Sequence, residues 1–295
     1  MSLFKNISSL RNQIDYSSKE GLVELSGETL NKLQDTLFSM YSDIYAVCQK
    51  YDITPFLTGG SELGAIRHKN FIPWDDDFDI AMTRKDNDKF LKIFENELSD
   101  KYVLNAPNYS NRAKARFTKI MKKGTLCRQI GDKSPASQCG VFMDVFVIDN
   151  VPNNSVHRKI KGLMCNAAEF ISGQVWLSEL REYSQKDTIF KIRRFIGICF
   201  SFLSSNEWFN LIDRIVKYRD ENSVCCALPT GRKHYFGEIL KREDIFPPRY
   251  VDFRNTKVPV FNHVEVHLEK LYGKDYMKLP PENKRERHLI ERLKL

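Results

Sequence analysis

Apolar residues between positions 28 and 51 recur at three- and four-residue steps, namely Leu30, Leu33, Leu37, Met40, Tyr41, Ile44 and Val47. This spacing places them on one face of a helix. The pattern therefore predicts an amphipathic helix from Glu28 to Tyr51, ended by Asp52 and Pro55. We expect it to pack behind a sheet, although a helix that binds a partner would show the same pattern.

The next segments alternate in the manner of strands. A short apolar strand is predicted at Pro55–Leu57, and a second one follows in which Phe78, Ile80 and Met82 share one face. Residues 116–121 and Gly140–Ile148 are predicted as further strands. On the second strand Asp77 and Asp79 face the side opposite the apolar residues. Asp75 joins them if the strand starts early, whereas Asp76 faces the other way.

Helical patterns fill much of the remaining chain. They predict helices at Asp86–Leu98, over most of 155–220, from Val264 to Gly273, and at 283–295. Cys225 and Cys226 indicate a strand that enters a turn, and 241–248 an extended connection. The predicted class is α+β. We divide the chain into a helical region (1–52), a core that carries the site (53–150) and a helical and C-terminal region (151–295) that completes the acceptor side.

The acidic strand indicates a metal site. Asp77 and Asp79 are two residues apart, about 6.6 Å along an extended chain, so their carboxylates can converge on ions between them. Two carboxylates about 4 Å apart repel by about 4 kcal/mol at an effective dielectric of 20. A hard divalent cation removes that repulsion, and oxygen-only ligands favour Mg²⁺ or Mn²⁺ over zinc. An acidic run can also be a solvated loop.

A glycine turn precedes the acidic strand. Thr58, Gly59, Gly60 and Ser61 separate the first strand from a helix-like run, Glu62–His68. Glycines let backbone N–H groups approach a phosphate closely, with Ser61 as the expected helix N-cap. Such a sequence alone is more often a simple turn. Arg67, Arg84 and Lys119 are candidate phosphate ligands, against ordinary surface charge as the alternative.

Asp144 is the one acid in the middle of the apolar strand Gly140–Ile148. A carboxylate among buried residues costs free energy unless it is paired or bound to a metal. Asp144 is therefore the most informative residue outside the segment 57–82. We interpret Asp149, at the predicted end of this strand, as a turn residue.

The net charge indicates which classes of partner the protein can bind, and the cysteines indicate the redox state of its cellular compartment. The chain of 295 residues has 46 basic and 38 acidic residues and a formal charge of +8, which suits anionic partners. It shows no basic stripe with interleaved aromatics, so we expect no nucleic acid. The seven cysteines form no CxxC pair, and residues 1–20 lack the features of a secretory signal. We expect a reducing, cytoplasmic location.

The longest apolar run, Phe195–Leu203, has nine residues. A helix needs about 20 to span a bilayer. Basic residues 191, 193 and 194 precede the run, so the segment 188–209 is a candidate for peripheral contact with the inner surface of the membrane. A core helix with a charged start is the alternative.

Residues 59–86, GGSELGAIRHKNFIPWDDDFDIAMTRKD, resemble the signature of the LicD family, which includes the fukutin-related proteins. Residues 271–277 and Pro280–Pro281 resemble the closing segment of that family more weakly. The resemblance implies a nucleotidyltransferase (polymerase-beta-like) fold, a mixed sheet flanked by helices, here with a mainly helical insertion and C-terminal region. It implies the turn at Gly60 and Ser61, metal binding by Asp77, Asp79 and Asp144, and assistance from Asp75.

The same resemblance implies metal-dependent transfer of a phospho-alcohol, phosphocholine first, from a CDP-linked donor to a sugar hydroxyl. The acceptor would be a cell-surface glycan such as teichoic acid, lipopolysaccharide or capsule, and it can be lipid-linked. Alternatives are a nucleotidyltransferase that attaches NMP from an NTP to a small molecule or RNA, a magnesium-dependent phosphodiesterase, and a non-catalytic binding module. Neither the alcohol nor the accepting sugar follows from the sequence.

Overall fold

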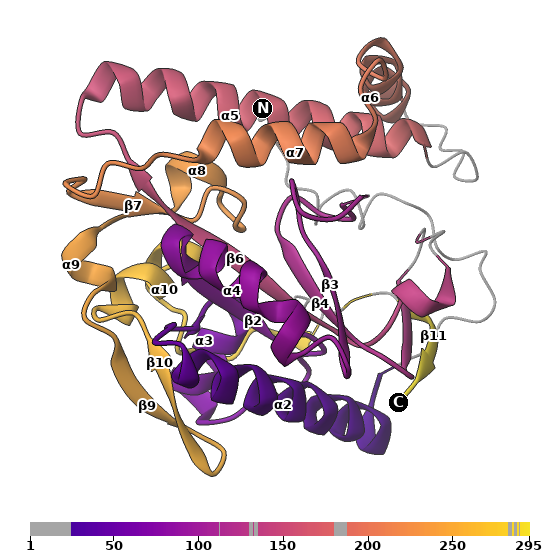
Figure 1. The fold of residues 1–295 in the computed structure, drawn as a ribbon, viewed down its shortest axis with the longest axis vertical. Helices are drawn as coiled ribbons and strands as arrows, with labels where there is room; N and C mark the ends of the chain where they lie inside the picture. The colour runs from indigo at the N-terminus through magenta and orange to yellow at the C-terminus, as the bar shows by residue number, and fades with distance from the viewer. Residues whose placement is uncertain are drawn as a thin grey trace.

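A computed structural model describes residues 25–111, 113–129, 132, 135–179, 188–282, 285, 288 and 290–295. It has the predicted α+β class, with a curled mixed sheet flanked by helices (Figure 1). The strands of the sheet run in the order β1-β2-β6-β4-β3, and β7 and β8 extend it from the end of β6. Their bounds are β1 (Phe56–Leu57), β2 (Asp79–Thr83), β3 (Tyr102–Asn105), β4 (Thr118–Lys122), β6 (Phe142–Val151), β7 (Cys225–Ala227) and β8 (Ile239–Lys241).

Strands β2 and β6 are parallel, and the other pairs in this sheet are antiparallel. The parallel pair lies in the middle of the sheet. Its two strands are mostly apolar on both faces, with Asp79, Thr83, Asp144, Asp149 and Asn150 as the polar positions, as expected for strands covered on both sides. Met82, Val145 and Ile148 are almost fully buried.

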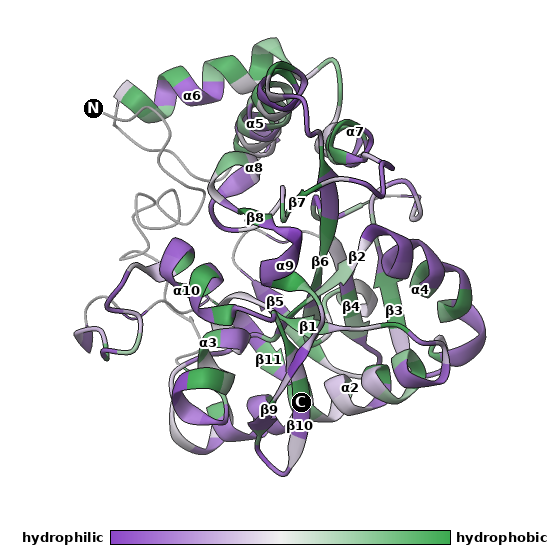
Figure 2. Cartoon of the chain, turned by 90° about the vertical axis from the view of Figure 1, so that its left-hand side faces the viewer, coloured by the Kyte–Doolittle hydropathy of each residue, from purple (hydrophilic) through white to green (hydrophobic). Residues whose placement is uncertain are grey.

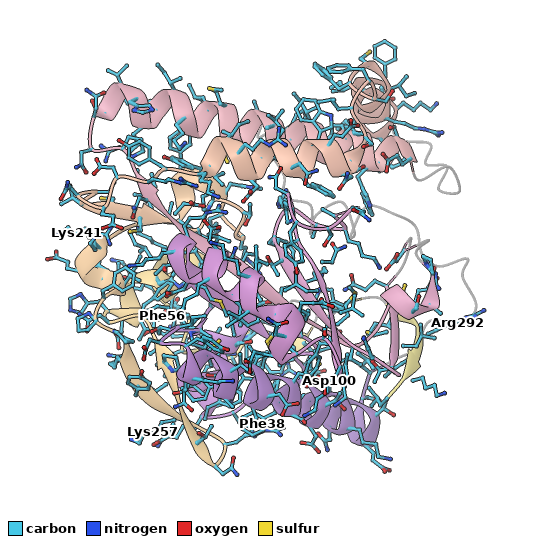
Figure 3. All side chains as sticks on the ribbon, viewed as in Figure 1. Phe38, Phe56, Asp100, Lys241, Lys257 and Arg292 are labelled. Carbon is cyan, nitrogen blue, oxygen red and sulfur yellow. The ribbon has the colours of Figure 1, made fainter. Side chains whose placement is uncertain are left out.

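Helices α2 (Gly27–Lys50) and α4 (Arg84–Glu97) confirm two predicted helices. The repeated apolar face of α2 is buried in the same core as β2 and β6. Phe38 of α2, labelled in Figure 3, stacks on Phe253. Phe253 in turn packs edge to face against Phe71 and Phe78. Thr83 caps α4 by accepting a hydrogen bond from the Asp86 N–H.

Helices α5 (Ser155–Glu179), α6 (Thr188–Cys199) and α7 (Ser205–Val216) confirm the helical prediction for 155–220 within the described residues. They gather at one end of the molecule around a second core (Figure 1). Ser204 and Glu207 form a capping box at the start of α7. Of the described helices, none is both long enough and apolar enough for a membrane span.

The C-terminal third returns to the first core. A hairpin, β9 (Arg249–Phe253) and β10 (Thr256–Val260), follows two short helices, α8 (His234–Gly237) and α9 (Arg242–Ile245). The extended connection predicted for 241–248 is thus wrong over α9, where two acids in the first turn favour a helix start. Helix α10 (Val264–Tyr272) ends before Gly273 as predicted.

The helix predicted for 283–295 is wrong over its last residues, 290–294, while residues 283, 284, 286, 287 and 289 lie outside the described residues. Residues Ile290–Lys294 form strand β11, which pairs antiparallel with β5 (Leu126–Gln129). Ile290 is 1% exposed and packs in the first core. The pairing joins segments more than 150 residues apart, so no local pattern could reveal it. The division at residue 150 stays a prediction.

Candidate active site

The glycine turn connects the end of β1 to the start of helix α3 (Gly59–His68). Thr58 occupies the N-cap position, and Gly59 has a φ of +57°, a conformation that glycine adopts without strain. Ser61 is therefore inside the helix, and its predicted role as N-cap is wrong. Its hydroxyl accepts a hydrogen bond of 2.9 Å from the Asp79 N–H. This bond joins the start of α3 to the start of β2.

The two glycines bring the start of α3 against the acidic segment. A Cβ atom on Gly59 would lie 3.1 Å from Oδ2 of Asp79, and one on Gly60 would lie 2.7 Å from Oδ2 of Asp75. Any larger residue would push these carboxylates away. The predicted phosphate-binding turn and two of the predicted metal ligands therefore share one site.

Asp79 and Asp144 are direct register partners on the parallel strands β2 and β6. Lys119 is the register partner of Asp144 on the other side, from β4. Its ammonium nitrogen lies 2.5 Å from Oδ1 of Asp144 and 3.7 Å from the centre of the Phe142 ring. Lys119 thus points at the acids rather than into solvent, although its predicted role on a diphosphate stays a prediction.

The acids at this site repel one another. The pKa of Asp79 is raised well above its usual range, first by removal from water and then by Asp77, Asp144 and Asp75. The pKa of Asp77 is also raised, again mainly by removal from water. Lys119 lowers both values but does not offset the repulsion. A donor set of hard carboxylate oxygens with excess negative charge fits a divalent cation such as Mg²⁺ or Mn²⁺.

A second acid pair lies at the entrance to β2. Asp76, 2% exposed in its side chain, accepts a bond from the backbone N–H of His288, and one of its oxygens lies 2.8 Å from Nδ1 of that residue. Nδ1 also lies 3.6 Å from Oδ2 of Asp77. Sequence reasoning missed His288, because 212 residues separate it from Asp76.

Ligand atoms of Asp76, Asp77 and His288 all lie within 4.8 Å of one another. Within the described part of the chain, no group of three that contains Asp79 or Asp144 is as compact. The four acids of the predicted metal set, Asp75, Asp77, Asp79 and Asp144, thus lie in one region. Their carboxylate oxygens do not form a group as compact as that of Asp76, Asp77 and His288. The metal set stays a prediction.

Arg67 joins α3 to the C-terminal segment. Its guanidinium donates to the carbonyl oxygens of Tyr276 and Lys278, and it lies 5.9 Å from the Trp74 ring. Arg285 covers the same ring at 4.3 Å. Trp74 is 9% exposed, so it fills the core. Substrate binding by Arg67 stays a prediction, since its contacts here are internal.

Arg84 is held by two carboxylates. It makes two hydrogen bonds to Asp149, of 2.9 and 2.7 Å, and one of 2.7 Å to Asp213 of α7. Asp149 is 1% exposed and lies inside β6, so its interpretation as a turn residue is wrong. With these partners Arg84 links α4, β6 and α7. Its role in holding a donor phosphate stays a prediction.

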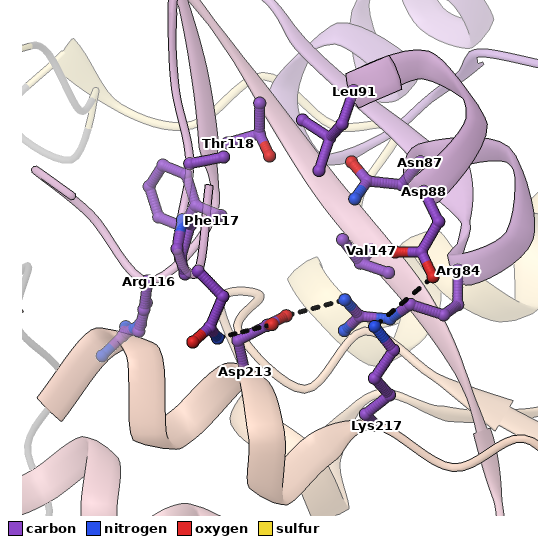
Figure 4. A pocket seen from close by; sticks show the side chains of 13 residues that line it. Arg84, Asn87, Asp88, Leu91, Arg116, Phe117, Thr118, Val147, Asp213 and Lys217 are labelled. Carbon is purple, nitrogen blue, oxygen red and sulfur yellow. Dashed lines mark hydrogen bonds and ion pairs between the residues drawn. The ribbon is translucent and has the colours of Figure 1, made fainter. Parts of the chain in front are cut away.

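A small pocket of about 100 Å³ adjoins Arg84 (Figure 4). Its lining includes Arg116, Phe117 and Thr118 beside β4, and Asp213 and Lys217 from the region of α7. None of the four acids of the candidate metal set lines it. The pocket is therefore not formed by these acids, although Val147 of β6 is among its lining residues.

Comparison with known proteins agrees with the sequence resemblance. Residues 52–161 match the family model described as LicD/FKTN/FKRP, nucleotidyltransferase domain. The chain is 29% identical over 277 residues to the lipopolysaccharide cholinephosphotransferase LicD of Haemophilus influenzae, covering 89% of this chain and 97% of the relative. It is 34% identical over 58 residues to the uncharacterized protein RT0683 of Rickettsia typhi, 20% of this chain and 19% of that protein. These matches confirm the resemblance of this chain to the LicD family, which the family model places at residues 52–161.

Proposed function

We propose that this protein transfers a phospho-alcohol, with phosphocholine as the first candidate, from a CDP-linked donor to a sugar hydroxyl of a cell-surface glycan. The observation that carries the proposal is the register pairing of Asp79 and Asp144 beside the glycine start of α3. The similarity to a lipopolysaccharide cholinephosphotransferase over nearly the whole relative supports the choice of phosphocholine and of a glycan acceptor. Lipopolysaccharide, teichoic acid and capsule are the candidate acceptors.

Asp75, Asp77, Asp79 and Asp144 would hold Mg²⁺ or Mn²⁺. When bound, the ion neutralises charge on the donor diphosphate and on the oxygen that leaves with CMP. The backbone at Gly59 and Gly60 offers N–H groups of the first turn of α3 to the remaining phosphate oxygens. Because these donors are fixed by the helix, they need no rearrangement during the reaction.

Asp144 is our candidate for the general base that accepts the proton of the acceptor hydroxyl. One of its oxygens contacts Lys119, which fixes the orientation of the carboxylate. Lys119 also brings a positive charge to the place where phosphate oxygens would lie. The aligned pair of β4 and β6 thus supplies both the base and the residue that orients it.

The donor is tested by phosphorus NMR on the purified protein with CDP-choline, CDP-glycerol, CDP-ribitol, CTP and ATP, with magnesium or chelator, and with or without bacterial glycan extract. CMP release from one CDP-alcohol that requires the acceptor supports the proposal and names the donor. Pyrophosphate from a triphosphate would support the nucleotidyltransferase alternative instead. Hydrolysis of the donor without acceptor would indicate a phosphodiesterase.

A cytoplasmic location is part of the same proposal, because CDP-linked donors would be available there. A lipid-linked acceptor would present its sugar at the inner surface of the membrane. We propose that the enzyme reaches such an acceptor at that surface.

A further inference from the structure

Two helices of this protein expose an unusual number of large apolar side chains. Of the seventeen large hydrophobic residues that are exposed in the described chain, nine lie between positions 156 and 202. We call this set the apolar face, which has two parts: Val156, Ile160, Leu163 and Met164 in the first half of α5, and, where α6 packs against the second half of α5, Ile189, Ile192, Phe195 and Ile198 of α6 with Phe202 just beyond it. Phe195 is 65% exposed and Phe202 is 73% exposed. Clusters of this kind mark interaction sites more often than single exposed residues do.

Helix α6 is held firmly enough to present these side chains. Gly197 of α6 approaches α5 so closely that a Cβ there would lie 2.0 Å from the carbonyl oxygen of Gln174. On the same side, Phe190 is buried against Leu177, and Arg193 donates a 2.8 Å bond to the side chain of Gln174. The inner side of α6 is thus packed, and its exposed apolar residues lie on the outer side.

Both helices lie at the end of the molecule opposite α2 and the β9-β10 hairpin (Figures 1 and 2). Figure 2 shows hydrophobic residues along α6 where it projects at this end. The candidate active site, on α3, β2 and β6, lies in the other core. The apolar face is therefore separate from the site that we propose for transfer.

Basic residues predominate along the two helices, although Glu207, an exposed acid, follows Phe202 by five residues and Arg193 lies on the packed side of α6. Helix α6 has three basic residues, Lys191, Arg193 and Arg194, and no acid. Residues 155–168 of α5 have Arg158, Lys159 and Lys161, and again no acid. Lys159 and Lys191 are exposed, and Arg158 and Arg194 are partly exposed. A soluble partner would have to present apolar and acidic groups arranged to match this surface. A bilayer needs no such match, because apolar residues bordered by cations suit its acyl chains and anionic headgroups.

We infer that the apolar face of α5 and α6 binds peripherally to a phospholipid bilayer that contains anionic lipid. The apolar side chains enter the headgroup boundary, and the basic residues beside them contact lipid phosphates. Helix α6 has 12 residues, fewer than a span requires, so it lies along the surface. The inference goes beyond the proposed transfer and does not depend on it.

The test is co-sedimentation of the full chain with vesicles of phosphatidylcholine alone and with vesicles that also contain phosphatidylglycerol. We expect binding to the second kind only, and weaker binding as salt is raised. The double variant Ile192→Ser/Phe195→Ser should bind about tenfold more weakly or worse, since it removes two apolar contacts with the lipid. Lys191→Gln/Arg194→Gln should weaken binding by a similar factor and reduce the salt dependence.

Tyr250→Ser is the matched control, because Tyr250 is 51% exposed on β9 at the other end of the molecule. It should bind vesicles like the wild type, and circular dichroism melting should show all variants folded.

Equal binding to both kinds of vesicle, no binding to either, or unchanged binding by the Ile192/Phe195 variant would overturn the inference. So would a wild-type dimer in light scattering that this variant dissociates, because a second copy would then cover the face. Sedimentation does not require catalysis, so failure here leaves the proposed transfer untouched.

Discussion

At the scale of single residues, the site depends on how closely α3 approaches the acids. Gly59 has a positive φ and lies against Asp79, whereas Gly27 has a similar φ of +54° with no atom within 4 Å of its missing Cβ. The two glycines therefore separate two effects of a methyl group, namely backbone strain and steric displacement of the carboxylate.

We predict that Gly59→Ala and Gly27→Ala both lower the free energy of unfolding by about 1–2 kcal/mol, the cost of a left-handed conformation. Only Gly59→Ala should weaken Mg²⁺ or Mn²⁺ binding, because only its methyl group displaces Asp79. Urea denaturation and calorimetric metal titration measure the two quantities. Equal metal affinity in both variants would show that the contact of Gly59 with Asp79 does not shape the metal site.

The Ser61 hydroxyl supplies the acceptor for the Asp79 N–H. We predict that Ser61→Ala lowers the free energy of unfolding by about 1–3 kcal/mol, the cost of an unpaired buried group. Ser42→Ala is the control, since Ser42 is exposed on α2 and only donates to the Phe38 carbonyl within the same helix. It should change stability by much less. A similar loss in both would mean that the bond to Asp79 contributes nothing.

At the scale of elements, the C-terminal segment closes the first core. Strand β11 pairs with β5, His288 holds Asp76, and α10 contacts α3. Sequence reasoning found α10 from its periodicity and its terminal glycine, but it interpreted the charged segment 283–295 as a helix. Ile290 is buried through long-range pairing, which local spacing does not report.

We predict that Ile290→Ala lowers the free energy of unfolding by about 2–5 kcal/mol, the usual cost of a cavity in a core. Leu295→Ala, at a residue that is 40% exposed, should change it by less than about 1 kcal/mol. Chemical denaturation of both variants measures the difference. If the two losses are alike, β11 is not part of the folding core.

A buried histidine connects α10 to α3. Nδ1 of His267 lies 2.6 Å from Oε2 of Glu62, and Nε2 lies 3.6 Å from Oε2 of Glu238. Burial lowers the pKa of His267, but the two carboxylates outweigh this and raise it to about 9. A raised pKa means that the folded state binds this proton more tightly than the unfolded state does, so the stabilisation is lost at high pH.

We therefore predict that the contribution of His267 is fully present below pH 6.5 and is lost as the pH rises through about 9. Its size is at most about 3.4 kcal/mol, from about 1.36 kcal/mol for each unit of the pKa shift from 6.5 to about 9. The check compares urea midpoints of wild type and His267→Gln across this window. The variant should be less stable at neutral pH and should lose less stability as the pH rises. Parallel curves would mean that His267 is neutral in the folded protein.

At the scale of the whole molecule, the sequence allowed the α+β class, a strand carrying Asp79 and the place of Asp144 in an apolar strand to be predicted, because each has a local pattern. The strand begins only at Asp79, so Asp77, which was predicted on it, lies in the segment before it. The alternation around Asp79 marks that residue, and the isolation of one acid in an apolar strand marks Asp144. The partners of Arg67, Arg84 and Asp76 could not be predicted, since they come from segments that meet only on folding. Of the three basic residues predicted to bind phosphate, Arg67 and Arg84 therefore contact other parts of the protein, whereas Lys119 faces the acids.

The most direct test of the account is transfer from CDP-choline to a bacterial glycan by wild type and Asp79→Asn, followed as CMP release with magnesium or chelator. We expect that the wild type requires both acceptor and metal. Asp79→Asn should fold normally and lose at least about 100-fold in rate, because a group that stabilises the transition state is removed. Asp100→Asn, at an exposed acid just before β3 that is labelled in Figure 3, should retain full activity. Transfer at nearly the wild-type rate by Asp79→Asn would show that Asp79 is not part of the transfer site.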